Sequence, residues 1–423
     1  MKCIIIYNVN RVIVFLRRKE EMIELPFDED IDIRMLENVF DDMTNSYKIF
    51  WFLGVFEEVI ANKKIISFKE VVARMIAKAW YPLLNYNLNF GSQDQMSKNI
   101  KKIFNEYIKD KEISKFQLYK ELCSTENKEL EKIMKEFYKY VPYRLLRGFY
   151  KNELRGVKDG IINKSIEELA KNDSRVFYRI NSEKKQIYIN ENWYKYICKN
   201  QNIIRGWANY NLILFLQNKN PSVPAIPLKL EPPIERNLVN AKKYWNNVIK
   251  NIRIKDIYTG EYFTEEKYKE NGPLSIDHFL PWSFVGHDEL WNLVPTFRNI
   301  NSSKSDSLPR YDIYIEDFSE VQFQGIDFIR KQRESRKYIE EYLSIDKTLD
   351  IKAIMNVNSE LNKDKFIHDL KAMINPLYQI AYNQGFHEWT YNISNKDIIR
   401  LDKKVEKCNI IGSNLNGKSK QCT

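Results

Sequence analysis

The sequence predicts a mainly α-helical protein, α+β overall, in which one small α+β module carries the candidate functional residues. Apolar residues recur at spacings of three and four over most of residues 20–142 and 311–392, which is the periodicity of amphipathic helices. Residues 176–190 alternate apolar and polar side chains around Asn181, as the two strands of a β-hairpin do. A spaced set of Asp, His, Asn and Lys residues occupies residues 275–309. These three observations together predict the fold class.

The N-terminal part of the chain, residues 1–220, is expected to be a helical region that recognises a substrate or a partner. Its aromatic residues recur at helical spacing, so we expect them in a core and not on a base-stacking surface. Pro82 is expected to stop the second of the predicted helices. The spacing of apolar residues predicts helices at residues 34–62, 68–86, 97–108, 126–140 and 193–217.

A proline-rich segment separates this region from the rest of the chain. Five of the thirteen residues from Pro221 to Pro233 are proline, which predicts an extended linker. The polar composition of the last residues predicts a flexible tail. We therefore place the linker at residues 221–236, the functional module at 237–310, a C-terminal helical part at 311–401 and the tail at 402–423.

The charge of the chain suits a polyanionic partner. The formal net charge is +10 and the sequence pI is about 9.0. Arg144, Arg147 and Lys151, with Tyr143 and Tyr150 interleaved, form a candidate nucleic-acid-binding strip. The alternative interpretations are a solvated helix face for the strip and a genomic base bias for the Lys-rich composition.

The cysteines and the hydropathy pattern bear on the compartment. The five cysteines are scattered, odd in number and without metal-ligand spacing, so we expect reduced thiols in a cytoplasmic protein. The apolar runs near the N-terminus are short and interrupted by charged residues, so we expect no membrane association.

A second motif lies in the tail. Residues 412–419, Gly-Ser-Asn-Leu-Asn-Gly-Lys-Ser, match the pattern of a phosphate-binding loop. That pattern binds phosphate only when a strand precedes it and a helix follows it. Too few residues follow Ser419 to form a helix, so we expect no nucleotide binding here.

The residues of the module have the spacing of a metal-dependent phosphodiesterase site. Asp277 and His278 are adjacent, Asn292 lies 14 residues after His278, Asn301 lies 9 residues further and Lys304 lies 3 beyond that. Carboxylate and amide oxygens are ligands that Mg²⁺ or Mn²⁺ prefer. The histidine is then left to take a proton from water.

These residues make the segment similar to the HNH (ββα-metal) endonucleases. The resemblance covers about residues 253–310, and its spacing is closest to the HNH domain of RNA-guided CRISPR effector nucleases and to stand-alone bacterial HNH proteins. The residues that carry it are Asp277, His278, Pro281, Ser283, Phe284, Asn292, Asn301, Lys304, Asp306 and Pro309.

The sequence departs from the commoner HNH pattern at the positions of a structural zinc. Many members carry two Cys-x-x-Cys pairs there, whereas this chain has Asp256 and Thr259 at the first pair and Phe297 and Ile300 at the second. We therefore expect no structural zinc and a domain of the zinc-free branch. Packing of apolar residues should hold the site instead, in particular Leu293, Phe284, Phe297 and Ile300.

The resemblance implies a role for each residue of the set. His278 would be the general base, and Asp277 and Asn301 would hold one Mg²⁺ or Mn²⁺ ion in an exposed cleft. Asn292 would fix the loop and the His278 ring. Lys304 would contact a phosphate or pair with Asp306. Two strands at residues 258–263 and 273–276 would form the ββ arm, and the α element would begin at Asn301.

The function implied by the resemblance is a metal-dependent HNH endonuclease that hydrolyses phosphodiester bonds in DNA, with a role in bacterial defence or restriction. Its partners would be DNA and a further protein or a second copy of the chain. Two alternatives remain at this point. One is a toxin-type nuclease that cleaves RNA or tRNA, and the other is a non-catalytic nucleic-acid-binding subunit with an HNH fold.

Overall fold

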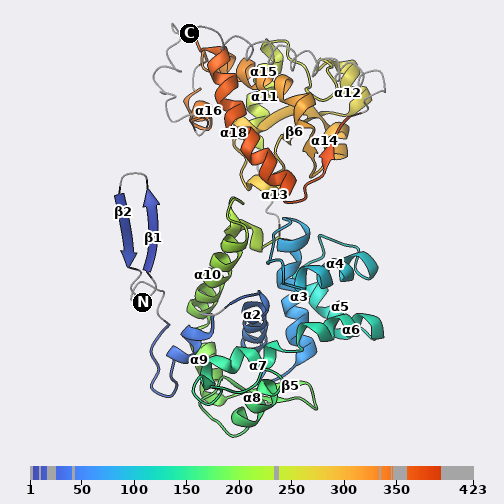
Figure 1. Cartoon of the computed structure of the whole chain (residues 1–423). Helices are drawn as coiled ribbons and strands as arrows, with labels where there is room; N and C mark the ends of the chain where they lie inside the picture. The colour runs from blue at the N-terminus through green and yellow to red at the C-terminus, as the bar shows by residue number, and fades with distance from the viewer. Residues whose placement is uncertain are drawn as a thin grey trace, which may run out of the picture. The chain divides into compact units, whose positions relative to one another are not determined.

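The structure, a computed structural model, divides into two compact units that are described separately. The first unit comprises residues 1–221 and 230–232, and the second comprises residues 222–229 and 233–423. Helices dominate both units and the sheets are small, which confirms the predicted fold class (Figure 1). The residues whose placement the structure describes are 3–8, 11–16, 25–40, 43–232, 238–332, 335–343, 345 and 360–391.

The first unit is built from helices around one small sheet. Strands β4 (Tyr178–Asn181) and β5 (Gln186–Ile189) form the predicted hairpin, and the unpredicted strand β3 (Ile65–Ser67) pairs with β5. A separate hairpin pairs β1 (Cys3–Asn8) with β2 (Arg11–Leu16). The helices are α1 (Arg34–Glu37), α2 (Tyr47–Ile60), α3 (Phe68–Leu84), α4 (Met96–Glu106), α5 (Lys115–Ser124), α6 (Lys128–Phe137), α7 (Val141–Leu146), α8 (Ile162–Ala170), α9 (Glu191–Lys199) and α10 (Gln201–Lys219), with 3-10 turns η2 (Asn38–Phe40) and η3 (Arg147–Tyr150).

Three predicted helix boundaries in this unit are wrong. The stretch 34–62 is not one helix, because the Ser46 backbone N–H donates to the Asp94 carboxylate at 2.7 Å and a new helix, α2, begins after it. The stretch 193–217 falls into two helices that meet at Asn200. Pro82 does not stop α3, which continues to Leu84 with the proline inside its last turn.

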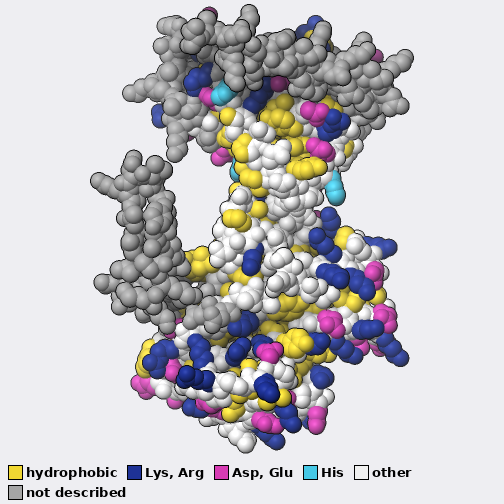
Figure 2. Space-filling model, viewed as in Figure 1, with side chains coloured by type: hydrophobic (Ala, Val, Ile, Leu, Met, Phe, Trp, Pro, Cys, Tyr) yellow, Lys and Arg dark blue, Asp and Glu magenta, His cyan; other side chains and the backbone are white. Residues whose placement is uncertain are grey.

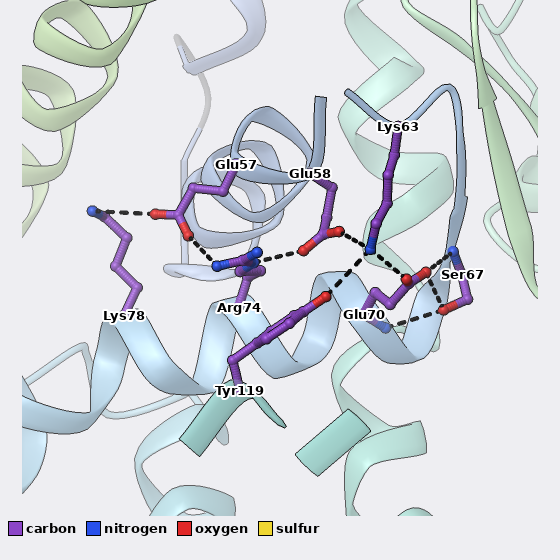
Figure 3. A network of polar contacts seen from close by, with 8 residues as sticks. All are labelled: Glu57, Glu58, Lys63, Ser67, Glu70, Arg74, Lys78 and Tyr119. Atoms are coloured by element: carbon purple, nitrogen blue, oxygen red, sulfur yellow. Dashed lines mark hydrogen bonds and ion pairs between the residues drawn. The ribbon is translucent and has the colours of Figure 1, made fainter. Parts of the chain in front are cut away.

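A network of charged residues joins α2 to α3 (Figure 3). The fully buried Glu58 carboxylate accepts from Arg74 Nε at 2.6 Å and from Lys63 Nζ at 2.6 Å. Lys63 also pairs with Glu70 at 2.7 Å, and Glu70 closes a capping box with Ser67 at the start of α3. The remaining members drawn in Figure 3 are Glu57, Lys78 and Tyr119. Three carboxylates therefore meet three cations.

The second unit contains the predicted module. Strand β6 (Leu274–His278) pairs antiparallel with β7 (Leu293–Phe297), and β8 (Leu308–Pro309) pairs parallel with β9 (Glu388–Trp389). The helices are α11 (Val239–Asn251), α12 (Glu265–Asn271), α13 (Trp282–Val285), α14 (Arg298–Lys304), α15 (Tyr311–Ile329), α16 (Arg336–Glu340) and α18 (Lys363–Asn383), with the 3-10 turn η5 (Leu290–Asn292).

One hydrophobic core joins the module to the helices before and after it. Trp245 of α11 donates its indole N–H to the Leu293 carbonyl at 3.1 Å, and Gln322 of α15 donates to the same carbonyl at 2.8 Å. A Cβ at Gly325 of α15 would lie 2.7 Å from the Tyr244 hydroxyl of α11, so the two helices need glycine there in order to pack. Strand β7 is thus held in place by both helices.

The proline-rich segment is not the extended linker that we expected. Residues 226–230 form the 3-10 turn η4 (Ile226–Leu230), and residues 222–229 belong to the second unit. Lys229 is 1% exposed and donates to the Phe284 carbonyl at 2.6 Å and the Pro224 carbonyl at 2.8 Å. Burial lowers the pKa of this ammonium to about 7. The segment is therefore anchored on α13.

The predicted tail, residues 402–423, and the phosphate-loop pattern within it lie outside the described residues. None of the helices that the structure describes combines the length and the apolar character that crossing a bilayer requires.

Candidate active site

The ββα element that carries the site is made of β6, β7 and α14. In the antiparallel register Asp277 lies opposite Val294 and His278 lies opposite Leu293. The predicted pairing of residues 258–263 with 273–276 is wrong, because the partner of β6 is β7 and the earlier segment forms only an isolated bridge from Lys255 to Tyr262. The helix follows β7 directly at Arg298, so Asn301 lies within it and does not begin it.

Asp277 is buried and both of its carboxylate oxygens have partners. The residue is 3% exposed, so the expectation of a side chain exposed in a cleft is wrong. Oδ2 accepts from the Tyr258 hydroxyl at 2.5 Å, and Oδ1 pairs with Lys304 Nζ at 3.1 Å. Burial raises the pKa of Tyr258 well above its ordinary value, so the phenol stays a proton donor to the carboxylate. Tyr258 has no signal in the sequence that marks it for this role.

Lys304 is the cationic partner of Asp277. Its side chain is fully buried, and Nζ also donates to the His278 carbonyl at 2.8 Å. Neither expected role therefore fits: the ammonium is not exposed to contact a phosphate, and it does not pair with Asp306. The Asp306 carboxylate accepts from the Ser283 hydroxyl at 2.5 Å instead.

His278 is held by a carboxylate that the sequence reasoning missed. Its Nε2 lies 2.8 Å from Asp288 Oδ1, and the imidazole side chain is 4% exposed. A neutral imidazole that donates from Nε2 has Nδ1 as its acceptor. Asp288 lies in the loop between α13 and η5, ten residues after His278. In the sequence, the only indication of this contact is that Asp288 is an acidic residue between the two halves of the motif.

Asn292 fixes the backbone that follows His278. Its Oδ1 accepts from the Leu280 N–H at 2.8 Å and its Nδ2 donates to the Leu280 carbonyl at 2.9 Å. Its own carbonyl accepts from the Phe279 N–H at 2.8 Å. The side chain thus holds the loop, but the partner of the His278 ring is Asp288, whose carboxylate accepts from Nε2.

The Asn301 side chain extends from α14 to β6, where it contacts the two residues that precede Asp277. Its Nδ2 donates to the Ser275 hydroxyl at 2.8 Å and to the Ile276 carbonyl at 3.1 Å. These bonds use both N–H groups of the Asn301 amide and hold its side chain against β6. In the described parts of the chain, no three His, Cys, Asp or Glu residues gather as a metal site. The prediction that Asp277 and Asn301 hold a metal ion therefore stays a prediction.

Hydrogen bonds and apolar packing occupy the positions where many HNH proteins hold zinc. Asp256 Oδ2 accepts from the Thr259 N–H at 3.0 Å and from the Thr259 hydroxyl at 2.7 Å, which closes the turn. Burial raises the pKa of Asp256 to about 6. Phe297 and Ile300 are buried at 0% and 3% exposure, as are Leu293 and Phe284.

The structure places the other predicted residues elsewhere. Arg144, Arg147 and Lys151 belong to the first unit, on α7, η3 and the turn after them, where they line a cleft. They therefore belong to a different unit from the ββα element.

Comparison with known proteins agrees with this geometry. The family described as HNH endonuclease matches residues 256–310, which include the Asp256 turn, both strands and α14. None of the curated proteins and none of the solved structures compared with the chain matches it. Residues 256–310 thus form a domain of the HNH endonuclease family, and this family points to nuclease activity on a nucleic acid.

Proposed function

We propose that this protein is a metal-dependent endonuclease that hydrolyses phosphodiester bonds in DNA. The proposal rests on the hydrogen bonding of the His278 imidazole on the ββα element. Asp288 engages Nε2 at 2.8 Å, and Nδ1 remains as an acceptor. A histidine with one nitrogen held and the other basic is arranged as a general base.

His278 would take a proton from a water molecule at Nδ1, and that water would attack phosphorus as the bond to the leaving oxygen breaks. The imidazole becomes positive in this step, and the Asp288 carboxylate beside Nε2 stabilises that charge. Asn292 keeps the backbone after His278 in place. Because the imidazole is nearly buried, access of water and phosphate requires a neighbouring segment to move.

Asp277 and Asn301 would hold the metal ion, which supplies charge stabilisation at the phosphate when it is bound. The donor set fits Mg²⁺ or Mn²⁺, because both atoms offered are hard oxygens. The buried Asp277 carboxylate already has one cationic partner, the Lys304 ammonium at 3.1 Å, so a metal ion would bind beside an existing ion pair.

The finer features of the proposal rest on the sequence. DNA is favoured over RNA because the motif spacing resembles the HNH domain of RNA-guided CRISPR effector nucleases. A zinc-free domain is favoured because Asp256, Thr259, Phe297 and Ile300 occupy the zinc positions. The same resemblance supports a role in bacterial defence.

The test is cleavage of supercoiled plasmid, linear duplex DNA and RNA by the full chain with Mg²⁺, with Mn²⁺ and with EDTA. We expect DNA cleavage only with a divalent ion. In His278→Ala the cleavage rate should fall by about 10²–10⁴-fold, the usual contribution of a general base. An unchanged rate in that variant, or full cleavage in EDTA, would overturn the mechanism. Cleavage of RNA but not DNA would show that the substrate is RNA and not DNA.

Three further variants separate effects on catalysis from effects on folding. Asn301→Ala should raise the Mg²⁺ concentration for half-maximal rate, and Asn301→Asp should retain more activity because it keeps an oxygen at that position. Asp277→Ala leaves the buried Lys304 without its carboxylate, so a loss of stability should accompany its loss of activity. Melting curves of all variants provide the control.

A further inference from the structure

The first unit contains a large, positively charged cleft that the nuclease domain does not explain. Its volume is about 1100 Å³, and its lining comes from residues 38–159 of the first unit. Pockets for small ligands measure roughly 300–1,000 Å³ and are mostly apolar. This cleft is larger, and seven of its lining residues are Lys or Arg against two that are Glu or Asp.

Most of this positive charge has no ion-pair partner among the residues that the structure describes. Arg144 pairs with Asp159 at 2.8 Å, and Lys48 also has a partner. The other cations of interest are exposed and, among the residues that the structure describes, form no ion pair: Lys98, Lys139, Arg147, Lys151 and Arg155. Figure 2 shows Lys and Arg side chains gathered over the first unit near α7 and α9. Unpaired cations on a concave surface attract a polyanion.

The spacing of the cations explains why they share one surface. Arg144, Arg147, Lys151 and Arg155 follow one another at intervals of three and four residues along α7, η3 and the turn that ends at Gly156. Such intervals place side chains on one face of a helical segment. The helix-face alternative therefore describes their spacing correctly, but this face lines a cleft.

Other lining groups match the chemistry of a nucleic-acid strand. Tyr140 is 52% exposed, and the Lys139 ammonium lies 5.3 Å from the centre of its ring. Exposed aromatic rings beside cations are the stacking platforms of single-strand binding proteins. Gly148 and Gly156 have no atom within 4 Å of where a Cβ would lie, so the backbone there is open to close approach.

We propose that this cleft binds the phosphodiester backbone of a nucleic acid. A nucleic acid is favoured over an acidic protein segment because the same chain carries an HNH nuclease domain and because the cleft combines guanidinium groups with an exposed aromatic ring. The inference concerns binding and does not depend on His278 being catalytic.

The test measures binding of labelled duplex DNA, single-stranded DNA and RNA by fluorescence anisotropy in EDTA. The full-length chain carries His278→Ala, so that catalysis plays no part. The cleft variant is Arg147→Glu/Lys151→Glu/Arg155→Glu. The control, Lys164→Glu/Lys184→Glu/Lys195→Glu, changes the net charge equally at exposed residues of the same unit that do not line the cleft.

We expect the cleft variant to bind roughly tenfold or more weakly at low salt than the control, and its slope of log affinity against log salt to fall by about 3. The nucleic acid with the largest loss identifies the natural ligand. Equal losses in the cleft and control variants, or no loss in either, would overturn the proposal. Equal weakening for poly-glutamate and for every nucleic acid would also overturn it and favour an acidic protein.

A second variant removes no side chain. Gly148 lines the cleft and has room for a Cβ, so Gly148→Glu adds a negative charge there, and Gly148→Ala is its matched control. We expect the Glu variant to bind several-fold more weakly and the Ala variant to bind like the parent protein. Loss of affinity in both variants would point to a backbone effect and contradict the inference.

Discussion

The charged network of the first unit and the active site of the second use buried charge in different ways. In the network of Figure 3, Glu58 meets both Arg74 and Lys63, and Lys63 meets Glu70 as well. In the candidate active site Asp277 is also paired, but within the described parts of the chain no hydrogen bond engages the second ring nitrogen of His278 or the amide oxygen of Asn301.

This difference distinguishes buried polar groups that stabilise the fold from buried polar groups that can take part in a reaction. A group whose hydrogen-bonding capacity is used up within the protein stabilises the fold and has little left for a substrate. A buried group that retains an unused acceptor is held in one geometry and can still react. Mutations in the network should therefore change stability, mutations of His278 and Asn301 should change the rate, and Asp277→Ala, which breaks an ion pair inside the site, should change both.

Glu58→Ala should give the largest loss of stability, because it leaves Arg74 and Lys63 beside an empty, largely buried site. Breaking a buried pair in this way typically costs roughly 3–5 kcal/mol. Urea unfolding followed by circular dichroism measures it. The exposed Lys64–Glu191 pair supplies the control, and Glu191→Ala should leave the midpoint unchanged. Below the melting temperature, cleavage by Glu58→Ala should match the wild type; a stable but inactive variant would contradict the comparison.

The second prediction concerns Asp256, a buried carboxylate that has hydrogen bonds but no ion pair among the described residues. Its pKa is raised by burial from 3.8 to about 6, so the folded state binds the proton more tightly than the unfolded state. Its contribution to the free energy of unfolding therefore increases as pH falls from 7 through 6 to about 4, by roughly 3 kcal/mol in total.

Asp256→Asn removes this contribution. The stability of the variant relative to the wild type should be greatest near pH 7 and should decline toward pH 4. Urea unfolding of both proteins at each pH measures the difference. A difference that does not vary with pH would show that the carboxylate is not the titrating group.

Asp288→Asn should have the smallest of these effects and is the sharpest test of the active site. Loss of a carboxylate that orients a histidine commonly lowers activity by about 10–100-fold. Melting should change little, because the Asp288 side chain is 30% exposed. Asp288→Glu should recover part of the rate, and the pH profile of the cleavage rate should shift in Asp288→Asn. If both variants cleave like wild type, Asp288 does not position His278.

The sequence was sufficient to predict the class of fold and the location of the nuclease domain. Helical periodicity identified most of the helices, and alternation identified the 176–190 hairpin. Helical periodicity failed where a residue distant in the sequence determines the backbone conformation. The Asp94 carboxylate accepts from the Ser46 N–H, and the helix predicted at 34–62 is interrupted there. Periodicity also failed for short elements such as β3, because three residues carry no period.

At the site, the spacing of Asp277, His278 and Asn301 was informative because residues of one strand and the following helix are brought together by the ββα geometry. Tyr258 and Asp288 could not be assigned in the same way. Tyr258 reaches Asp277 from a turn 19 residues earlier, and Asp288 reaches His278 from a loop. Such contacts depend on three-dimensional packing and leave no fixed interval in a sequence.

Lys304 gives the domain an internal counterion. Because its ammonium already neutralises Asp277, the protein can fold around this carboxylate without a divalent ion, unlike domains whose folding free energy is the free energy of metal binding. If Asp277 holds a metal ion as we propose, that ion would compete with the Lys304 ammonium, and its apparent affinity would be reduced by the free energy of the ion pair it disturbs. The domain would then be folded before the ion binds, and its activity would follow the concentration of the ion reversibly.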